Sequence, residues 1–275
     1  MPTVLILSSH VAASRVGGGA QALALARLGI EPILAPTVIY GRHPGWGPPG
    51  GGPVSAEIMQ SALDAVAYQG LFAEVDAVIC GYFALPEQVT VAARTLDFVR
   101  AANPRARLVV DPIMGDAGKG LYVSEAVAEA IAEALVPRAD LVTPNAWELS
   151  RLSDLPVFDA ASAARAARAM KRPVLVSSVE VKAEIGVVYA DAEVAALAVH
   201  ARRAKVPNGT GDLLSVLFVA GLLDMLEPKA ALACAVGAVA DAAEAASVGD
   251  QKELPISALP TQLARSPRVR LETLA

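Results

Sequence analysis

The strongest chemical signal in the chain is a glycine-bearing segment that stands directly before a long apolar run. Gly209, Thr210, Gly211 and Asp212 form this segment, and the apolar run continues to about residue 226. Two glycines allow the backbone to turn so that the N–H groups of the last three residues point at one place, where the dipole of a following helix also favours an anion. The segment therefore predicts an anion hole of the size of a phosphate group.

Asp212 is expected at the rim of this hole. A carboxylate in that place can orient a hydroxyl group and accept its proton while the hydroxyl attacks a γ-phosphoryl group. The alternative is an ordinary helix start, because Gly and Asp are common at such positions.

A second polar group follows a predicted strand that ends near Thr143. Asn145 and Glu148 are three residues apart, so their side chains lie on one face of a starting helix, which we expect to be exposed. The pair is suited to a hydrated Mg²⁺ ion, which keeps several waters and uses few protein carboxylates. A capping arrangement of the same two side chains is the alternative.

A third acidic position begins the segment from Asp111 to Asp116, at the carboxyl end of another predicted strand. Ligands of open α/β sheets bind at such strand ends. Acidic residues at several strand ends together with an anion hole suit a nucleoside triphosphate and its metal ion.

Short apolar runs alternate with alanine-rich helical patterns along the chain, which predicts βαβ units around a mostly parallel sheet in one α/β domain over residues 1–275. A Gly/Pro-rich stretch at 41–53 predicts a surface loop. The predicted strands are 3–8, 31–40, 76–82, 106–111, 139–144 and 172–178, with an antiparallel hairpin at 184–191 and 193–200. The predicted helices are 18–29, 55–69, 85–102, 124–135, 159–170, 212–226 and 229–247.

Composition excludes several classes of function. The chain has 275 residues, a net charge of -5 and scattered Lys and Arg residues, so no nucleic-acid partner is expected. No apolar stretch is expected to span a membrane, and the short apolar start lacks the basic leader of a signal peptide, so a cytoplasmic location is expected. Cys80 and Cys234 have no metal-ligand spacing and are interpreted as small core residues.

Five blocks of the sequence resemble pyridoxal kinases of the ribokinase-like superfamily, in the family order and through most of the chain. The resemblance implies a three-layer α/β/α fold with a mostly parallel central sheet and ATP bound near the C-terminal half, usually in a homodimer. It also implies phosphorylation of the 5′-hydroxymethyl group of pyridoxal, and of pyridoxine or pyridoxamine in some members. The blocks are LILSSHV (5–11), GYFALPEQV (81–89), residues 102–123, VTPNAWELS (142–150) and NGTGD (208–212).

Position by position, the resemblance assigns Asp212 as catalytic base and Gly209, Thr210 and Gly211 as its anion hole, with Asn145 and Glu148 organising Mg²⁺. The positions matched to the nucleotide site are Asp111, Thr143, Asn145, Glu148, Ser177, Lys205, Val206, Pro207 and Asn208. The positions matched to the substrate site are Ser9, His43, Trp46, Tyr82, Asp116 and Tyr122.

Two departures concern substrate preference. Many bacterial relatives have Gly-Asn where this chain has Gly17 and Gly18, and some have Cys in place of Leu121. Hydroxymethylpyrimidine kinase is the nearest alternative activity, but its members typically have Cys in place of Asp212. The N-terminal Gly-Gly signature and the lid insertion of ribokinase-type sugar kinases are not evident. A non-catalytic pyridoxal 5′-phosphate carrier is the remaining alternative, which the presence of Asp212 and Glu148 disfavours.

Overall fold

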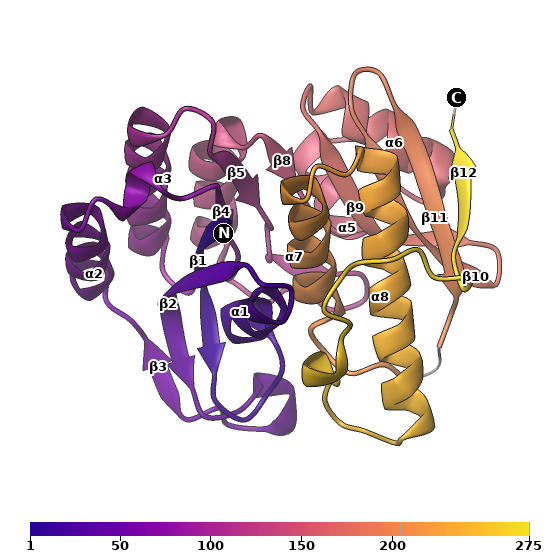
Figure 1. Ribbon diagram of the computed structural model, residues 1–275, viewed down its shortest axis with the longest axis horizontal. Coiled ribbons are helices and arrows are strands. Elements are labelled where there is room, and N and C mark those ends of the chain that lie inside the picture. Colours follow the sequence, from indigo (N-terminus) through magenta and orange to yellow (C-terminus); the bar gives the residue numbers. More distant parts are fainter. Residues whose placement is uncertain (204, 275) are drawn as a thin grey trace.

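The computed structural model describes residues 1–203 and 205–274, so residues 204 and 275 of the predicted domain lie outside the described part. Within that part, ten strands form one mixed sheet in the order β12-β11-β10-β9-β8-β5-β4-β1-β2-β3 (Figure 1). The pairs from β2 through β1, β4, β5 and β8 to β9 are all parallel, whereas both edges are antiparallel. A mostly parallel sheet is confirmed.

Apart from β3 and β12, the strands of the sheet lie close to the predicted apolar runs. Their bounds are β1 (Thr3–Val11), β2 (Glu31–Tyr40), β3 (Gly51–Pro53), β4 (Ala77–Cys80), β5 (Arg107–Val110), β8 (Leu141–Val142), β9 (Val174–Val181), β10 (Glu184–Ala190), β11 (Ala195–Ala201) and β12 (Arg270–Thr273). A separate two-stranded hairpin pairs β6 (Gly115–Asp116) with β7 (Gly120–Leu121). Strands β10 and β11 form the antiparallel hairpin that the sequence predicts.

Helices cover both faces of the sheet, which gives the expected three layers (Figure 1). One face carries α1 (Gly17–Arg27), α7 (Thr210–Leu223) and α8 (Pro228–Val248). The other carries α2 (Ala56–Tyr68), α3 (Pro86–Ala102), α4 (Glu125–Ala130) with the π-helical turn Ile131–Leu135, α5 (Ala146–Ser153) and α6 (Ala160–Ala169). Short 3₁₀ turns complete the fold at Pro44–Trp46, Leu71–Ala73, Val136–Arg138 and Ile256–Ala258.

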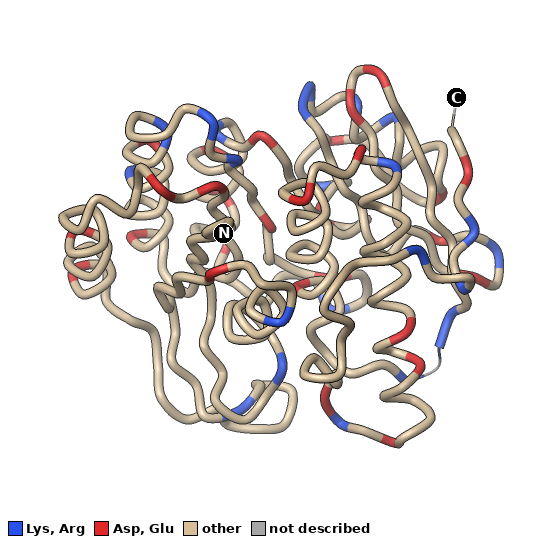
Figure 2. Tube along the Cα trace, viewed as in Figure 1, with Lys and Arg blue, Asp and Glu red and all other residues tan. Residues whose placement is uncertain are grey.

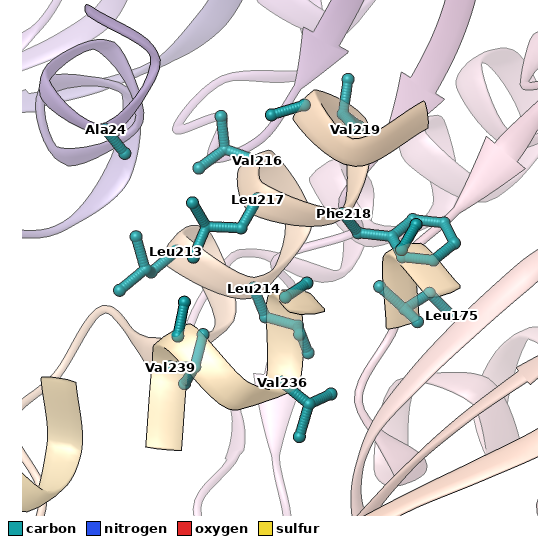
Figure 3. Packing of buried hydrophobic residues seen from close by; sticks show 14 of the residues in the cluster. Ala24, Leu175, Leu213, Leu214, Val216, Leu217, Phe218, Val219, Val236 and Val239 are labelled. Atoms are coloured by element: carbon teal, nitrogen blue, oxygen red, sulfur yellow. The ribbon is translucent and has the colours of Figure 1, made fainter. Parts of the chain in front are cut away.

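The side chains of each parallel strand alternate between two cores. In β1, Val4 and Ile6 pack with α1, α7 and α8, whereas Leu5 and Leu7 pack with α2 and α3. Helix α7 is buried along most of its length and lies at the centre of the first core, where Phe218 and its neighbours meet side chains of the sheet and of α8 (Figure 3). A helix that is apolar on all sides is held by packing rather than by exposed polar contacts, so its amino terminus is fixed in place.

Three features depart from the sequence-based expectations. The 41–53 stretch is mostly exposed as predicted, but it also contains a 3₁₀ turn and the short edge strand β3. Strand β12 and the hairpin of β6 and β7 were not predicted. Helix α8 is long and apolar enough to cross a membrane by length and composition, contrary to expectation, yet most of it is buried within the fold as a core helix.

Charged residues of both signs are distributed over the trace in the view of Figure 2, and Lys and Arg do not gather on one face there. Several pair with each other at the surface, as Arg138 does with Asp97 and Arg268 with Asp241. This distribution agrees with the absence of a basic patch in the sequence.

Candidate active site

The predicted site residues come together at the carboxyl edge of the parallel strands, where α1 and α7 begin. Asp111 directly follows β5 and Thr143 directly follows β8. Ser177, within β9, bridges to Asn145, and its N–H donates to the Pro144 carbonyl at 3.0 Å. Because adjacent parallel strands end at the same edge, residues far apart in sequence share one site.

The turn before α7 has the geometry that an anion hole requires. Gly209 is the N-cap residue and has φ of 93°, a conformation that favours glycine. A Cβ atom there would lie 2.4 Å from the Arg15 carbonyl oxygen, so the loop before α1 packs directly against this turn. Among the described residues no side chain caps α7, and nothing lies within 4 Å of where a Cβ on Gly211 would be. No side chain of the described residues therefore occupies the first N–H groups of α7, which leaves them available to an anion.

Asp212 lies in the first turn of α7 and faces the amino terminus of α1. Its side chain is mostly covered, and its Oδ1 atom is buried without a hydrogen-bond partner among the described residues. Burial raises the pKa of Asp212 to about 6, and a hydrogen bond from the Gly17 backbone N–H opposes part of that rise. An oxygen without a donor in a partly desolvated place is suited to accept a proton from a bound hydroxyl.

The Asn145 and Glu148 pair forms a reciprocal capping box at the start of α5. Asn145 Oδ1 accepts from the Glu148 N–H, and Glu148 Oε2 accepts from the Asn145 N–H, each at 2.9 Å. Glu148 Oε1 also accepts from the N–H groups of Met114 and Gly115 at 2.8 and 3.2 Å. Asn145 Nδ2 donates to the Gly115 carbonyl at 2.8 Å. The two side chains thus anchor the segment after β5 to α5.

The expectation that this helix start is exposed is wrong for Glu148, which is 3% exposed. The segment after β5 folds back over the carboxylate and covers it. Burial raises the pKa of Glu148 to about 7, and the hydrogen bonds from the Asn145, Met114 and Gly115 backbones work against this rise.

These contacts limit how the pair can hold a metal ion. A carboxylate has about four acceptor sites, and Glu148 uses three of them for backbone N–H groups. The described residues contain no cluster of three His, Cys, Asp or Glu side chains suited to a metal ion. The donor set therefore fits a hydrated Mg²⁺ ion contacted through water and held mainly by phosphate oxygens, and it does not fit an ion with several direct protein ligands.

Asp111 is linked to α7 through a serine that was not among the predicted site residues. Ser215 Oγ donates to Asp111 Oδ2 at 2.8 Å and lies 2.8 Å from Thr143 Oγ1. Burial raises the pKa of Asp111 well above its ordinary value, and the charges of Asp212 and Glu148 raise it further, whereas the two hydroxyl groups lower it. The signal for Ser215 was its position three residues after Asp212 within an otherwise apolar helix.

On the predicted substrate side, Ser9 lies where the register of β1 with β2 shifts, close to the start of α1. Its side chain fills the space next to Gly17, because a Cβ atom on Gly17 would overlap the Ser9 hydroxyl. Tyr82 follows β4, and its N–H donates to Ser8 Oγ at 3.1 Å. Burial raises the pKa of the half-buried Tyr82 phenol, and contact with Tyr40 adds to this effect.

The predicted loop residues His43 and Trp46 lie beside the approach to α7. His43 Nδ1 accepts from the Gly45 N–H at 3.0 Å and lies 3.4 Å from Asn208 Nδ2. Lys252 Nζ lies 5.3 Å from the centroid of the Trp46 ring. The structure thus joins a predicted substrate residue to a predicted nucleotide residue, Asn208, in one place.

Sequence reasoning missed the contribution of the segment after α8 to this region. Glu253 Oε2 accepts from the Arg15 N–H at 2.7 Å, on the loop whose carbonyl packs against Gly209. No sequence motif marks this contact, because an isolated glutamate in a polar stretch is typical of a solvated loop.

The hairpin of β6 and β7 carries the remaining predicted positions. Asp116 Oδ1 accepts from the Ala117 N–H at 2.8 Å, and the Tyr122 hydroxyl donates to the Gly115 carbonyl at 3.0 Å. Leu121, at the position where some relatives are expected to have Cys, packs against the core formed with α2 and α3. Its side chain has no thiol group. Lys205, Val206 and Pro207 lie in the largely exposed loop before α7, and within the described part of the chain no hydrogen bond ties their side chains to the site.

Two cavities lie at the opposite, amino edge of the sheet. The larger, of about 440 Å³, lies between the carboxyl ends of α2 and α3 and is lined mainly by apolar groups such as Phe72 and Phe98. The smaller adjoins the end of α7 and the start of β5. Neither cavity is lined by the carboxylates of Asp111, Glu148 and Asp212 or by the amino termini of α1 and α7. We therefore assign the active site to the carboxyl edge of the sheet.

Replacing Glu148 by Gln tests the anchoring role. The amide NH₂ group would face a backbone N–H group in either orientation, so we expect the variant to lose about 1–3 kcal/mol of stability. Thermal unfolding would show the loss, and Glu129→Gln on an exposed face of α4 is the matched control. An unchanged melting temperature in Glu148→Gln would contradict the anchoring role.

The raised carboxyl pKa values predict how stability depends on pH. Asp212 and Glu148 have pKa values of about 6 and 7 in the fold, above their ordinary values, so the folded state binds their protons more tightly than the unfolded state. The free energy of unfolding without ligand should therefore fall as the pH rises from 5 to 8, by roughly 4 kcal/mol. Denaturant unfolding at several pH values measures this, and Asp212→Asn should show a smaller fall. Equal slopes in both proteins would refute the contribution of Asp212.

The chain is similar to several known proteins. Residues 37–257 match the family model described as phosphomethylpyrimidine kinase. The chain is 31% identical over 277 residues to pyridoxal kinase PdxY of Corynebacterium diphtheriae, covering 98% of each protein. It is 33% identical over 228 residues to the pyridoxine/pyridoxal/pyridoxamine kinase of Bordetella avium, covering 80% of this chain and 77% of that protein.

Solved structures agree with the sequence relatives. The pyridoxal kinase from Leishmania donovani in complex with ADP superposes with a TM-score of 0.91 at 25% identity over 99% of both chains. The same enzyme in complex with ADP and pyridoxamine gives a TM-score of 0.90 at 25% identity, again over 99% of both chains. The ribokinase-like fold is thereby confirmed, and the chain belongs to the pyridoxal kinase family.

Proposed function

We propose that this chain transfers the γ-phosphoryl group of ATP to the 5′-hydroxymethyl group of pyridoxal and so forms pyridoxal 5′-phosphate. The observation that carries the proposal is Asp212, whose Oδ1 atom has no hydrogen-bond partner among the described residues, at the start of α7 in a chain of the pyridoxal kinase family. Related kinases bind ADP together with pyridoxamine or pyridoxine, which supports a nucleotide and a pyridine alcohol as the two ligands.

In this reaction the turn at Gly209 to Gly211 binds the transferred phosphoryl group through the first N–H groups of α7. These dipoles are fixed before the reaction, because α7 is buried in the core, so little reorganisation is needed as charge develops. Asp212 orients the substrate hydroxyl and accepts its proton. Its pKa of about 6 keeps it mostly ionised at neutral pH while leaving it more basic than an ordinary aspartate.

We infer that Mg²⁺ accompanies the nucleotide. When bound, the ion neutralises phosphate charge, as in other phosphoryl-transfer enzymes. Glu148 and Asn145 contribute by holding the segment after β5 in place, and Glu148 has about one acceptor site left for a metal-bound water. Asp111 adds a further carboxylate beside the phosphate region.

A homodimer and a cytoplasmic location are further proposals, which the family resemblance and the composition support. A nucleic-acid partner is not proposed, because the net charge is -5 and basic residues are scattered.

Turnover by the purified protein tests the activity directly. We expect MgATP-dependent phosphorylation of pyridoxal, followed by product absorbance and ADP release, in a panel with pyridoxine, pyridoxamine and hydroxymethylpyrimidine. Turnover of hydroxymethylpyrimidine without pyridoxal would establish the alternative kinase activity, which the family model at 37–257 makes the relevant comparison. Binding of pyridoxal 5′-phosphate with no turnover of any alcohol would indicate a carrier.

Asp212→Asn tests the role of the base. General-base catalysis contributes about 10²- to 10⁴-fold, so kcat should fall by that factor while nucleotide and pyridoxal affinities change little. Asn keeps the size of the side chain, and no side chain among the described residues caps α7, so the change separates chemistry from fold stability. If KM rose while kcat stayed unchanged, Asp212 would instead contribute equally to binding of the ground state and of the transition state. A fall in kcat of less than about threefold would refute the assignment.

A further inference from the structure

Ser215 is the only polar side chain of α7 between Leu213 and Leu223, and it is 2% exposed. Burying a hydroxyl group is costly unless it is hydrogen-bonded. Elsewhere in the buried stretch of α7 the positions that hold small residues are Ala220 and Gly221, neither of which has a hydroxyl group. A serine at position 215 therefore indicates that its hydroxyl group makes a required hydrogen bond.

The hydroxyl group meets two site residues at once. Ser215 Oγ donates to Asp111 Oδ2 at 2.8 Å, and the same oxygen lies 2.8 Å from Thr143 Oγ1. Ser215 has a single proton, which the carboxylate receives, so Thr143 is the donor in the second contact. The hydrogen bonds thus run from Thr143 through Ser215 to Asp111, and each bond polarises the next one.

These bonds connect three separate elements of the site. Asp111 follows β5, Thr143 follows β8, and Ser215 lies one helical turn after Asp212 on α7. Repulsion between the Asp111 and Asp212 carboxylates across the site raises the pKa of Asp111. A bond from Asp111 to the helix that carries Asp212 holds the two carboxylates at one separation despite this repulsion.

We propose that Ser215 is a positioning residue that fixes the Asp111 carboxylate relative to α7 for phosphoryl transfer. This proposal rests on the kinase function proposed above and assigns Ser215 no contact with substrate. Without the hydroxyl group, the Asp111 side chain loses its bond to α7 and can turn to other rotamers.

The test is a double-mutant cycle between Ser215 and Asp111. Ser215→Ala should lower kcat by about 10- to 100-fold, the size expected for one hydrogen bond to a charged group, with KM for pyridoxal nearly unchanged. Because Ser215 acts through Asp111, the double variant Ser215→Ala with Asp111→Ala should be no slower than Asp111→Ala alone. A purely structural effect would instead multiply the two losses.

Two further variants separate the hydroxyl group from packing. Ser215→Thr keeps the donor and should stay within about threefold of wild type, less than the loss of one such bond. Thr95→Val removes an equally buried hydroxyl, which donates to the Val91 carbonyl in α3 at 2.9 Å, and should leave kcat unchanged. If Ser215→Ala melts below the assay temperature, Ser215→Cys takes its place, since the thiol is a weak donor of similar size, and kcat at least about tenfold below wild type is expected.

Several outcomes would overturn the positioning role: a rate near wild type in the folded Ala or Cys variant, equal impairment by Thr and Ala, or independent losses in the cycle. The proposed function fails separately, if wild type does not phosphorylate pyridoxal. In that case the cycle is measured on MgADP affinity by calorimetry, where the effects of Ser215→Ala and Asp111→Ala should again be non-additive. Additive effects on MgADP affinity would overturn the role of Ser215, whichever alcohol the protein phosphorylates.

Discussion

Three carboxylates, Asp111, Glu148 and Asp212, gather at one edge of the sheet, and each is largely removed from water. Burying a negative charge is costly unless donors compensate for it. The fold supplies these donors as backbone N–H groups at the starts of α1 and α5 and after β5, and as one buried hydroxyl group. The apolar core around α7 keeps them in place, because helix positions set by close packing do not yield to electrostatic repulsion.

The three carboxylates differ in how many hydrogen bonds they accept, and this difference indicates a different role for each. Glu148 accepts three backbone hydrogen bonds and holds the segment after β5, so it has little capacity left for chemistry. Asp111 is restrained by a hydroxyl group. Asp212 keeps one buried oxygen that has no hydrogen-bond partner among the described residues. A proton acceptor needs such an unsatisfied oxygen, whereas an anchor needs a saturated one.

The sequence predicted the parallel sheet and the position of each motif at a strand or helix end, because hydrophobic periodicity and glycine positions are local signals. It could not show that Glu148 is buried, since the cover comes from Met114 and Gly115 on another element. The edge strands β3 and β12 are short and lack alternation, so they leave no periodic signal. Ser215 is hidden for a related reason: one hydroxyl in an apolar helix carries no motif. The roles assigned to the individual site residues stay predictions.

The glycines at the start of α1 show how packing restricts substrate contacts. A Cβ atom on Gly18 would lie 2.5 Å from Leu34 Cδ1 and 3.2 Å from Ile6 Cγ2, and Gly17 has φ of 58° with Ser9 against it. These close contacts let α1 approach the end of β1, which brings the Gly17 N–H to Asp212. An asparagine at position 18 would require Leu34 to move. The lack of a polar side chain at position 18 therefore depends on Leu34 of β2, which packs against Gly18. A change of substrate contacts at this point involves both position 18 and position 34.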